Sequence, residues 1–268
     1  MTPRTATRPC RAWGHGRAAG VIAVLWLVSA SHVFASSPPS PVRLAWDEGD
    51  VAGFSTVFRE QGTAPIGFVE YHQTRHGDVL ECARVARFTA GSSDEDTAKA
   101  RVGTTLEAIA GRSIVRDARG ATVVDLAIDV ASGHLTGSFE DGGRRHEIDE
   151  HADLSPGTYW GPLIFLVVKS FEANADGDRL VFRTVAPTPK PRVIDMVLVR
   201  TGTDRLAGAR AGVRATRFEL RPDVPWPVGT VVRWIVPDTV FFVVPGAPPA
   251  LARFAGPRNY ALEPIRIE

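Results

Sequence analysis

The sequence predicts a mainly β protein, built as a single curved antiparallel sheet or half-open barrel with one or two short helices. Apolar and polar residues alternate with period two over many short segments, which is the pattern of half-buried strands. Gly- and Asp-containing turns separate these segments, and such short connections favour antiparallel neighbours over crossovers. Residues 42–268 fall within the length that single β domains occupy, so we expect one domain there.

The first 35 residues have the pattern of an export signal. They carry four arginines and no acidic residue, then an apolar run over 18–28, and then a small-residue cleavage sequence that ends at Ala35. The apolar run is shorter than the roughly 20 residues that a membrane-spanning helix needs. We therefore expect cleavage after Ala35, no stable membrane span afterwards, and a periplasmic or extracellular location. A retained membrane anchor is the alternative.

A flexible leader follows the signal, because the Ser-Ser-Pro-Pro-Ser-Pro sequence at 36–41 suits neither helix nor sheet. Loss of residues 1–35 leaves 27 basic residues against 30 acidic ones, a net charge of −3 with His neutral. That balance excludes the strongly basic class of nucleic-acid-binding domains. Cys82 is then left without an intramolecular disulfide partner, and its strand-like surroundings predict a small buried side chain.

Alternation is clearest at 123–130, where Val124, Leu126, Ile128 and Val130 share one face. The other strands are expected at 66–75, 79–89, 134–140, 144–150, 179–185, 193–200, 213–221, 230–236 and 239–244. Hairpin turns are expected at 76–78, 132–133 and 141–143, and Asp176-Gly177 predicts a further turn before 179–185.

Two segments predict helix. Residues 93–109 carry three acids near their start, which suits a helix N-terminus, although Gly103 interrupts the segment. In 162–174, Pro162 suits a first helical turn, and Leu163, Leu166 and Phe171 share a face. The second segment also fits a buried strand.

The densest polar cluster lies at 146–151. Its two histidines are five residues apart, so they do not share a helical face as a zinc-protease motif requires. On a strand, Glu147, Asp149 and His151 project from one face and form a candidate metal site. The alternative is a solvated outer strand face with Ile148 turned inward.

No nucleophile elbow, phosphate loop or dinucleotide fingerprint occurs in the sequence. The chain is therefore expected to act without a cofactor, and a non-enzymatic role is favoured, although an enzyme stays open.

Aromatic residues supply the remaining distinctive chemistry. If several of them line one concave sheet face, they form an apolar surface for a lipid or acyl chain. The alternative is that they close an ordinary core. The candidate ligand-binding residues are Tyr159, Trp160, Trp226, Trp234 and Phe242.

An export signal, many short strands, a Pro-rich break before an apolar hairpin, a Trp-x-Val-Pro strand at 234–237 and Phe-Ala-Gly-Pro at 254–257 follow one another in this chain. This order resembles uncharacterised bacterial envelope proteins whose fold is similar to the lipoprotein-localisation (Lol) carriers. The resemblance covers most of 42–268 and implies a curved antiparallel sheet that half-closes over an apolar cavity.

Three functions follow, in order of preference. The first is a secreted or periplasmic protein that binds a hydrophobic small molecule, a lipid or an exported envelope protein on the concave sheet face. The second is an envelope interaction or scaffold module without a small-molecule site, which the Pro-rich loops would suit. The third is a metal-dependent hydrolase that uses the 146–151 cluster.

Overall fold

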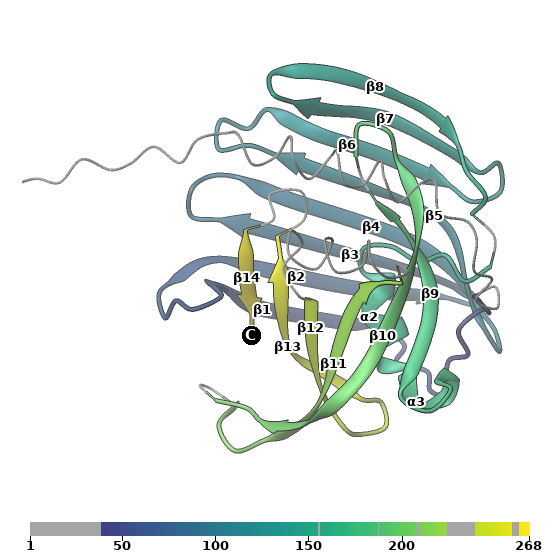
Figure 1. The fold of residues 1–268 in the computed structure, drawn as a ribbon, viewed down its shortest axis with the longest axis vertical. Coiled ribbons are helices and arrows are strands. Elements are labelled where there is room, and N and C mark those ends of the chain that lie inside the picture. The colour runs from purple at the N-terminus through teal and green to yellow at the C-terminus, as the bar shows by residue number, and fades with distance from the viewer. Residues whose placement is uncertain (1–38, 155, 187, 208–209, 224–238, 259–262) are drawn as a thin grey trace, which may run out of the picture.

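A computed structural model describes residues 39–154, 156–186, 188–207, 210–223, 239–258 and 263–268 (Figure 1). The strands of this part are β1 (Val51–Arg59), β2 (Pro65–His76), β3 (Val79–Phe88), β4 (Ser93–Val102), β5 (Leu106–Arg116), β6 (Thr122–Asp129), β7 (His134–Asp141), β8 (Arg144–His151), β9 (Arg179–Ala186), β10 (Arg192–Arg205), β11 (Arg214–Pro222), β12 (Thr239–Val244), β13 (Ala250–Pro257) and β14 (Pro264–Ile267). The helices are α2 (Leu163–Lys169) and α3 (Phe171–Asn174). None of the helices in the described residues is long and apolar enough to span a bilayer.

The strands form one 14-stranded antiparallel sheet that does not close, in the order β8-β7-β6-β5-β4-β3-β2-β1-β14-β13-β12-β11-β10-β9. The chain starts in the middle at β1 and proceeds outward to the edge strand β8. Residues 152–178 then cross to the opposite edge at β9, and the chain returns to β14 beside β1. Two arms result, the N-terminal arm (β1–β8) and the C-terminal arm (β9–β14), which curve around α2 (Figure 1). The predicted fold class is confirmed.

Strand alternation determines which side chains face the concave side of the curved sheet, between the arms, which we call the hollow. In β6, Val124, Leu126 and Ile128 are buried, whereas Asp129 is exposed. The expected strands that lie in the described residues are present, and the turns at 76–78, 132–133 and 141–143 join consecutive strands, with Gly77 and Gly133 at φ 63° and 68°. The expected strand at 230–236 lies outside the described residues. The sequence analysis did not predict β1, β13 or β14, which are rich in small residues or short, nor β5, whose start lies in the segment expected as helix.

The predicted helix at 93–109 is wrong, because this segment forms β4, a turn and the start of β5. In β4, Ala98, Ala100 and Val102 are buried and alternate with exposed Lys99 and Arg101. The alternation with period two favours a strand more strongly than the acidic residues at the start of the segment favour a helix. A helix would not place those three apolar residues on one face.

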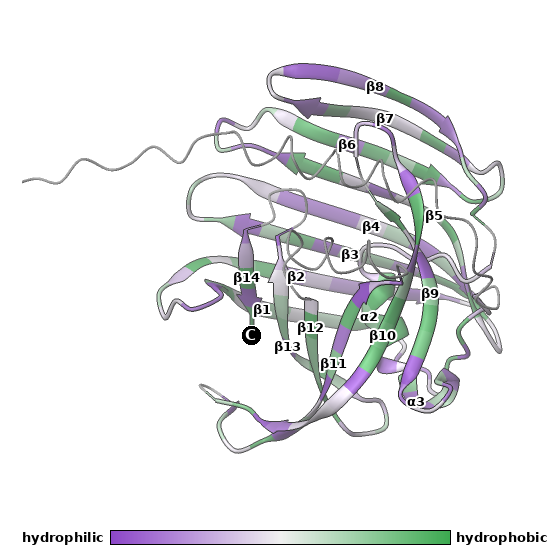
Figure 2. Ribbon diagram, in the orientation of Figure 1, coloured by the Kyte–Doolittle hydropathy of each residue, from purple (hydrophilic) through white to green (hydrophobic). Residues whose placement is uncertain are grey.

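The helix predicted at 162–174 is confirmed as α2 and α3, with Pro162 at the N-cap of α2. Leu163, Leu166 and Val167 are buried, and they join one core cluster with side chains from both arms. Figure 2 shows hydrophobic stretches in α2 and in the strands around it. The crossing segment therefore fills part of the hollow.

Tyr159 fastens the crossing segment at its start. Its hydroxyl accepts a hydrogen bond from Val42 N and donates one to Leu106 O, both at 2.8 Å. Its backbone N–H donates to Arg183 O at 2.8 Å, and Arg183 N donates to Gly157 O at 2.8 Å, so the segment covers part of the β9 edge. Burial raises the pKa of Tyr159 to about 12, which keeps the hydroxyl protonated as a donor.

Trp160 packs directly on Gly111 of β5. A Cβ atom at Gly111 would lie 2.0 Å from Trp160 Nε1 and 2.7 Å from Thr97 O. We expect Gly111→Ala to lower the free energy of unfolding by about 1–3 kcal/mol, because the indole and a strand backbone must both shift. Denaturant unfolding measures this change.

Gly53→Ala is the matched control within a strand, since its Cβ would meet nothing closer than Tyr71 Cβ at 4.0 Å. Equal unfolding free energies for the two variants would contradict the packing of Trp160 on β5.

Candidate functional site

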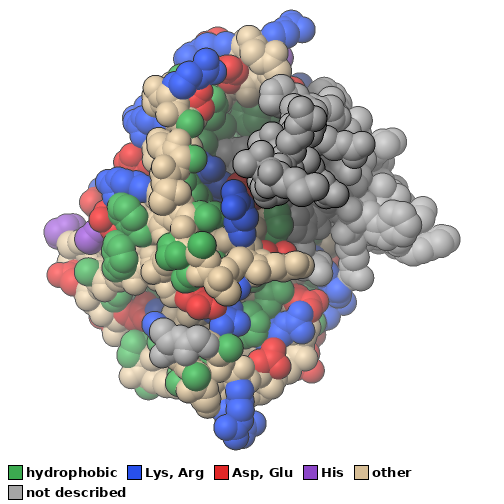
Figure 3. Space-filling view, turned by 90° about the vertical axis from the view of Figure 1, so that its left-hand side faces the viewer, with side chains coloured by type: hydrophobic (Ala, Val, Ile, Leu, Met, Phe, Trp, Pro, Cys, Tyr) green, Lys and Arg blue, Asp and Glu red, His purple; other side chains and the backbone are tan. Residues whose placement is uncertain are grey.

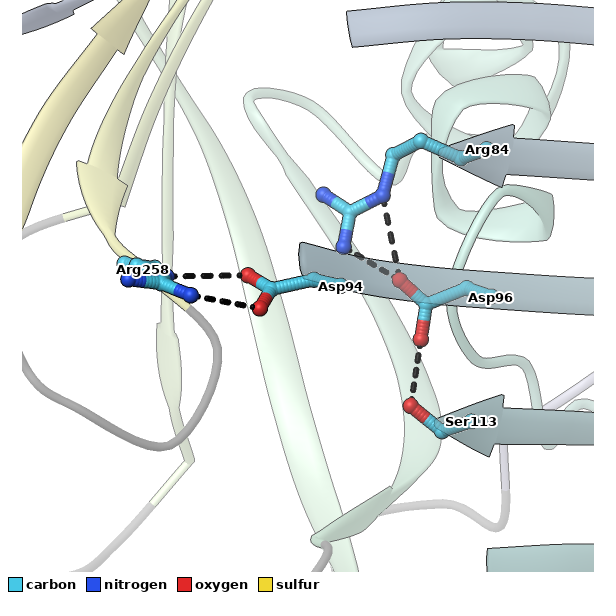
Figure 4. Close-up of polar contacts among 5 residues, drawn as sticks. All are labelled: Arg84, Asp94, Asp96, Ser113 and Arg258. Carbon is cyan, nitrogen blue, oxygen red and sulfur yellow. Dashed lines mark hydrogen bonds and ion pairs between the residues drawn. The ribbon is translucent and has the colours of Figure 1, made fainter. Parts of the chain in front are cut away.

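Charged side chains interrupt the apolar inner face of the N-terminal arm. Asp94 and Asp96 are two residues apart on β4, so both face the hollow, and both are buried. The cross-strand register places Asp96 opposite Arg84 of β3 and Ser113 of β5. Together with Arg258, which follows β13, these residues form what we call the inner polar belt (Figure 4).

Arg84, Asp96 and Ser113 form one half of the inner polar belt. The Arg84 guanidinium donates to Asp96 Oδ2 through both Nε, at 3.1 Å, and Nη2. The Ser113 hydroxyl donates to the other carboxylate oxygen at 2.5 Å. The side chains are 13% exposed for Arg84 and 7% for Asp96, so this ion pair is largely removed from water.

Asp94 and Arg258 form the other half and join the two arms. Arg258 Nε lies 3.1 Å from Asp94 Oδ2, and Nη2 lies 2.9 Å from Oδ1, which is a two-point contact across 164 residues of sequence. The guanidinium carbon lies 3.7 Å from the centre of the Phe88 ring. The Asp94 side chain is only 3% exposed, against 15% for Arg258. No local sequence pattern signals this contact.

The inner polar belt lies between two apolar clusters. The larger cluster spans both arms and includes Cys82, Ala98 and Phe241, whereas the smaller one lies at the β1–β14 junction around Val57 and Phe88. Phe254 packs against both clusters, and its ring centre lies 5.4 Å from that of Phe241. The hollow thus has a polar zone with apolar side chains on either side.

A second polar group lies next to the inner polar belt, on β2 and β3. The Tyr71 hydroxyl donates to Gln73 Oε1 at 2.8 Å and lies 3.7 Å from Cys82 Sγ. Burial raises the pKa values of the Tyr71 hydroxyl and the Cys82 thiol, the latter to about 11. Cys82 is buried and free, as the sequence predicted.

Nearby, Lys169 of α2 forms an ion pair with Glu48, with side chains 12% and 8% exposed. Glu48 precedes β1, so the pair fastens the helix to the start of the sheet.

The aromatic candidates occupy different places. Tyr159 and Trp160 are buried, at 0% and 5% exposure, and pack in the larger cluster. Phe242 faces away from that cluster, with the Arg253 guanidinium 5.4 Å from its ring centre, while the adjacent Phe241 faces the interior. Two neighbouring phenylalanines give no sequence signal for which one points inward. Trp226 and Trp234 lie outside the described residues.

Glu147, Asp149 and His151 share the outer face of β8, as the alternation predicted. Asp149 contacts His134 Nε2 at 2.5 Å, the rings of His134 and His151 stack at 4.5 Å, and Glu147 bonds Arg145 at 2.8 Å. No group of three or more potential ligands in the described residues has the arrangement of a metal site.

A shallow groove of about 470 Å³ lies on the opposite, outer face of β2–β5. Ala83, Thr97 and Ala110 lie at its floor, and His72 and the Glu81–Lys99 ion pair (2.6 Å) lie along it. The groove is thus lined by small apolar and polar side chains together.

No protein-family model matches this chain, and no curated protein does. Among solved structures, the chain is similar to a beta-barrel-like protein of the domain of unknown function DUF1849 from Brucella abortus. The two are 9% identical, the match covers 87% of this chain and 97% of that one, and the TM-score is 0.39.

Arg258→Met should lower the free energy of unfolding by about 3–5 kcal/mol, because it leaves the Asp94 carboxylate buried without its partner. The double variant Asp94→Leu/Arg258→Met should be more stable than Arg258→Met alone, since both charges are then gone. Chemical denaturation of the variants measures the coupling between the two side chains.

The control is Arg112→Met, which breaks the exposed Arg112–Asp125 pair and should cost less than about 1 kcal/mol. A loss at Arg258 no larger than that at Arg112 would contradict a buried link between the arms.

Cys82 should resist iodoacetamide at pH 8 in the folded protein. Its raised pKa, against an ordinary value of 9.0, lowers the thiolate fraction about a hundredfold, and burial blocks access. Peptide mapping by mass spectrometry should find modification of Cys82 only at denaturant concentrations that unfold the chain. Modification in buffer at the rate of an exposed thiol would contradict this placement.

Proposed function

We propose that this chain is a binding protein that holds a hydrophobic molecule in the hollow of its curved sheet. An oxygen-bearing polar group of that molecule would lie against the inner polar belt. The observation that carries the proposal is the belt itself, a set of paired charges placed between two apolar clusters on the inner face of the sheet.

Stability alone does not account for these charges. Well-packed apolar side chains of similar volume are often as stable as a buried ion pair or more so. Polar groups in an otherwise apolar pocket orient and select a ligand. An amphipathic ligand would use both parts of the hollow.

The guanidinium groups are the more accessible half of each pair. Arg84 and Arg258 are more exposed than the carboxylates that they contact. Arginine donates hydrogen bonds and cannot accept them, so the belt suits carbonyl, ester, hydroxyl or phosphate oxygens. Two arginines balance two aspartates, and the belt therefore favours an uncharged or zwitterionic polar group over a strongly anionic one.

The apolar part of the ligand would contact the phenyl rings beside the belt. Phe88 lies under Arg258, and Phe254 packs between the two apolar clusters. Figure 3 shows hydrophobic and basic side chains recessed on the side of the molecule that faces the viewer.

Export completes the proposal. The arginine-rich, then apolar, start of the chain and the cleavage sequence ending at Ala35 support secretion to the periplasm or beyond. In that aqueous compartment, poorly soluble molecules need a carrier. The resemblance of the sequence to envelope proteins similar to the Lol carriers supports such a role. N-terminal sequencing of the exported protein tests the cleavage site.

A scaffold module without a small-molecule site is the alternative. The observation that favours it is the crossing segment, whose Leu163, Leu166 and Val167 fill the hollow near α2 with the chain's own side chains.

Native mass spectrometry after mild purification should reveal acyl-chain adducts, and a dansyl-labelled undecanoic amide should bind at least as tightly as the corresponding acid. Arg84→Lys should weaken binding of the amide roughly tenfold, because lysine keeps the charge and loses the planar two-point donor. Dansyl fluorescence titration measures both effects.

Arg112→Lys, on the outer face, is the matched control and should leave the affinity unchanged. A chain that carries no adduct and binds neither probe would overturn the proposed function in favour of the scaffold.

A further inference from the structure

The two edges of the open sheet differ. At the β9 edge, Thr158 pairs with Arg183 in a parallel bridge, and the crossing segment bonds Arg183 through both N–H and C=O. At the β8 edge, eight residues from Arg144 to His151 have backbone bonds only to β7 among the described residues. Among the residues that the structure describes, the β9 edge is thus partly covered by the chain itself and the β8 edge is open. Open edges are where further strands add.

The direction of the free backbone groups at β8 follows from the ladder. Ala152 N donates to Gly133 O at 2.9 Å and continues the register in which His151 lies opposite His134. In an antiparallel ladder, hydrogen bonding to one neighbour alternates along the strand. Even-numbered residues of β8 therefore bond β7, and odd-numbered residues such as Arg145, Glu147 and Asp149 direct their N–H and C=O outward.

The charges on β8 are ordered from one end to the other. Arg144 and Arg145 stand at its start, and Asp149 and Glu150 stand near its end. We propose that β8 pairs antiparallel with β8 of a second copy of this chain, about a two-fold axis at Glu147, so that the two sheets become continuous. This inference is independent of the proposed ligand.

Charge complementarity selects this occupant and this register. With Glu147 at the axis, Arg145 lies opposite Asp149 of the second copy on the outer face, and Arg144 lies opposite Glu150 of the second copy on the inner face. Directly opposed unlike charges stabilise paired strands, and like charges destabilise them. Moving the copy by two residues in one direction places Glu147 opposite Asp149, which is unfavourable. Moving it in the other direction places Arg145 opposite Glu147 but Arg144 opposite Ile148, so the Arg144–Glu150 pairs are lost.

The neighbouring groups are compatible with this pairing. The two copies of Glu147 meet at the axis, but each carboxylate already accepts a bond from Arg145 Nε at 2.8 Å. Asp149 contacts His134 at 2.5 Å, and Glu150 lies 3.8 Å from Lys190, in a pair whose side chains are 35% and 47% exposed. A strand without the complementary order of charges would place like or unpaired charges opposite those of β8, which disfavours its pairing. The edge would therefore pair selectively with its own copy.

Sedimentation velocity of the full chain over a range of concentrations tests the proposal. The wild type should form a species of twice the monomer mass, more weakly as salt is raised. Arg144→Glu and Glu150→Arg should each weaken dimerisation roughly tenfold or more, because unlike pairs become like pairs in both symmetric positions. The double variant Arg144→Glu/Glu150→Arg should restore the dimer.

Arg205→Glu, an exposed reversal on β10, is the matched control and should change nothing. A wild type that stays monomeric at all concentrations, or a dimer that survives both single reversals, would overturn the proposal.

Glu147→Pro provides a second test with a separate readout of folding. Glu147 N–H points outward, so proline should keep the β7–β8 ladder, the near-ultraviolet circular dichroism spectrum and the unfolding midpoint. The variant should lose the dimer. A folded Glu147→Pro variant that dimerises like the wild type would contradict the strand pairing.

Discussion

Charged side chains are buried on the inner face of this curved sheet, and each of them needs a partner of opposite charge. Asp94 and Asp96 point into the hollow because β4 alternates, and a buried carboxylate needs a partner. Arg84 comes from the neighbouring strand, but Arg258 comes from the opposite arm. The β1–β14 junction is short in the described residues: its register runs from Val57↔Ile267 to Arg59↔Ile265, with further backbone bonds between Thr56 and Glu268 and from Glu60 to Pro264. The Asp94–Arg258 contact therefore helps to set the distance between the arms and the width of the hollow.

The crossing segment (residues 152–178) fills one part of the hollow and leaves another part to the inner polar belt. Tyr159, α2 and α3 fill one part of it and cover a sheet edge, which gives the curved sheet a core that a single open layer would lack. The inner polar belt and the rings of Phe88 and Phe254 form the part that we assign to a ligand. The side chains that pack the core and those that we assign to the ligand thus lie next to each other on the same strands. A substitution in the inner polar belt is therefore expected to change both the free energy of unfolding and the affinity for the ligand.

The sequence predicted the sheet where alternation is regular and missed it at β4, which carries Asp94 and Asp96. At 122–129 the apolar residues repeat every second position, and the strand was expected there. At 93–102 the inward positions begin with Asp94 and Asp96, so the same period is hidden and the acids suggest a helix start. The outer face of β8 was predictable from alternation alone. Phe241 and Phe242 are adjacent and identical, so alternation does not show which of them faces inward. No local pattern links Asp94 to Arg258, because that contact depends on how the arms fold back on each other.

The most direct test of this account is an experimental structure of the exported protein purified under mild conditions. We expect electron density for a bound molecule whose apolar part lies against Phe88 and Phe254 and whose polar oxygen is within hydrogen-bond distance of Arg84 or Arg258. A hollow closed at the inner polar belt by the chain's own side chains, with no space for a ligand, would contradict it.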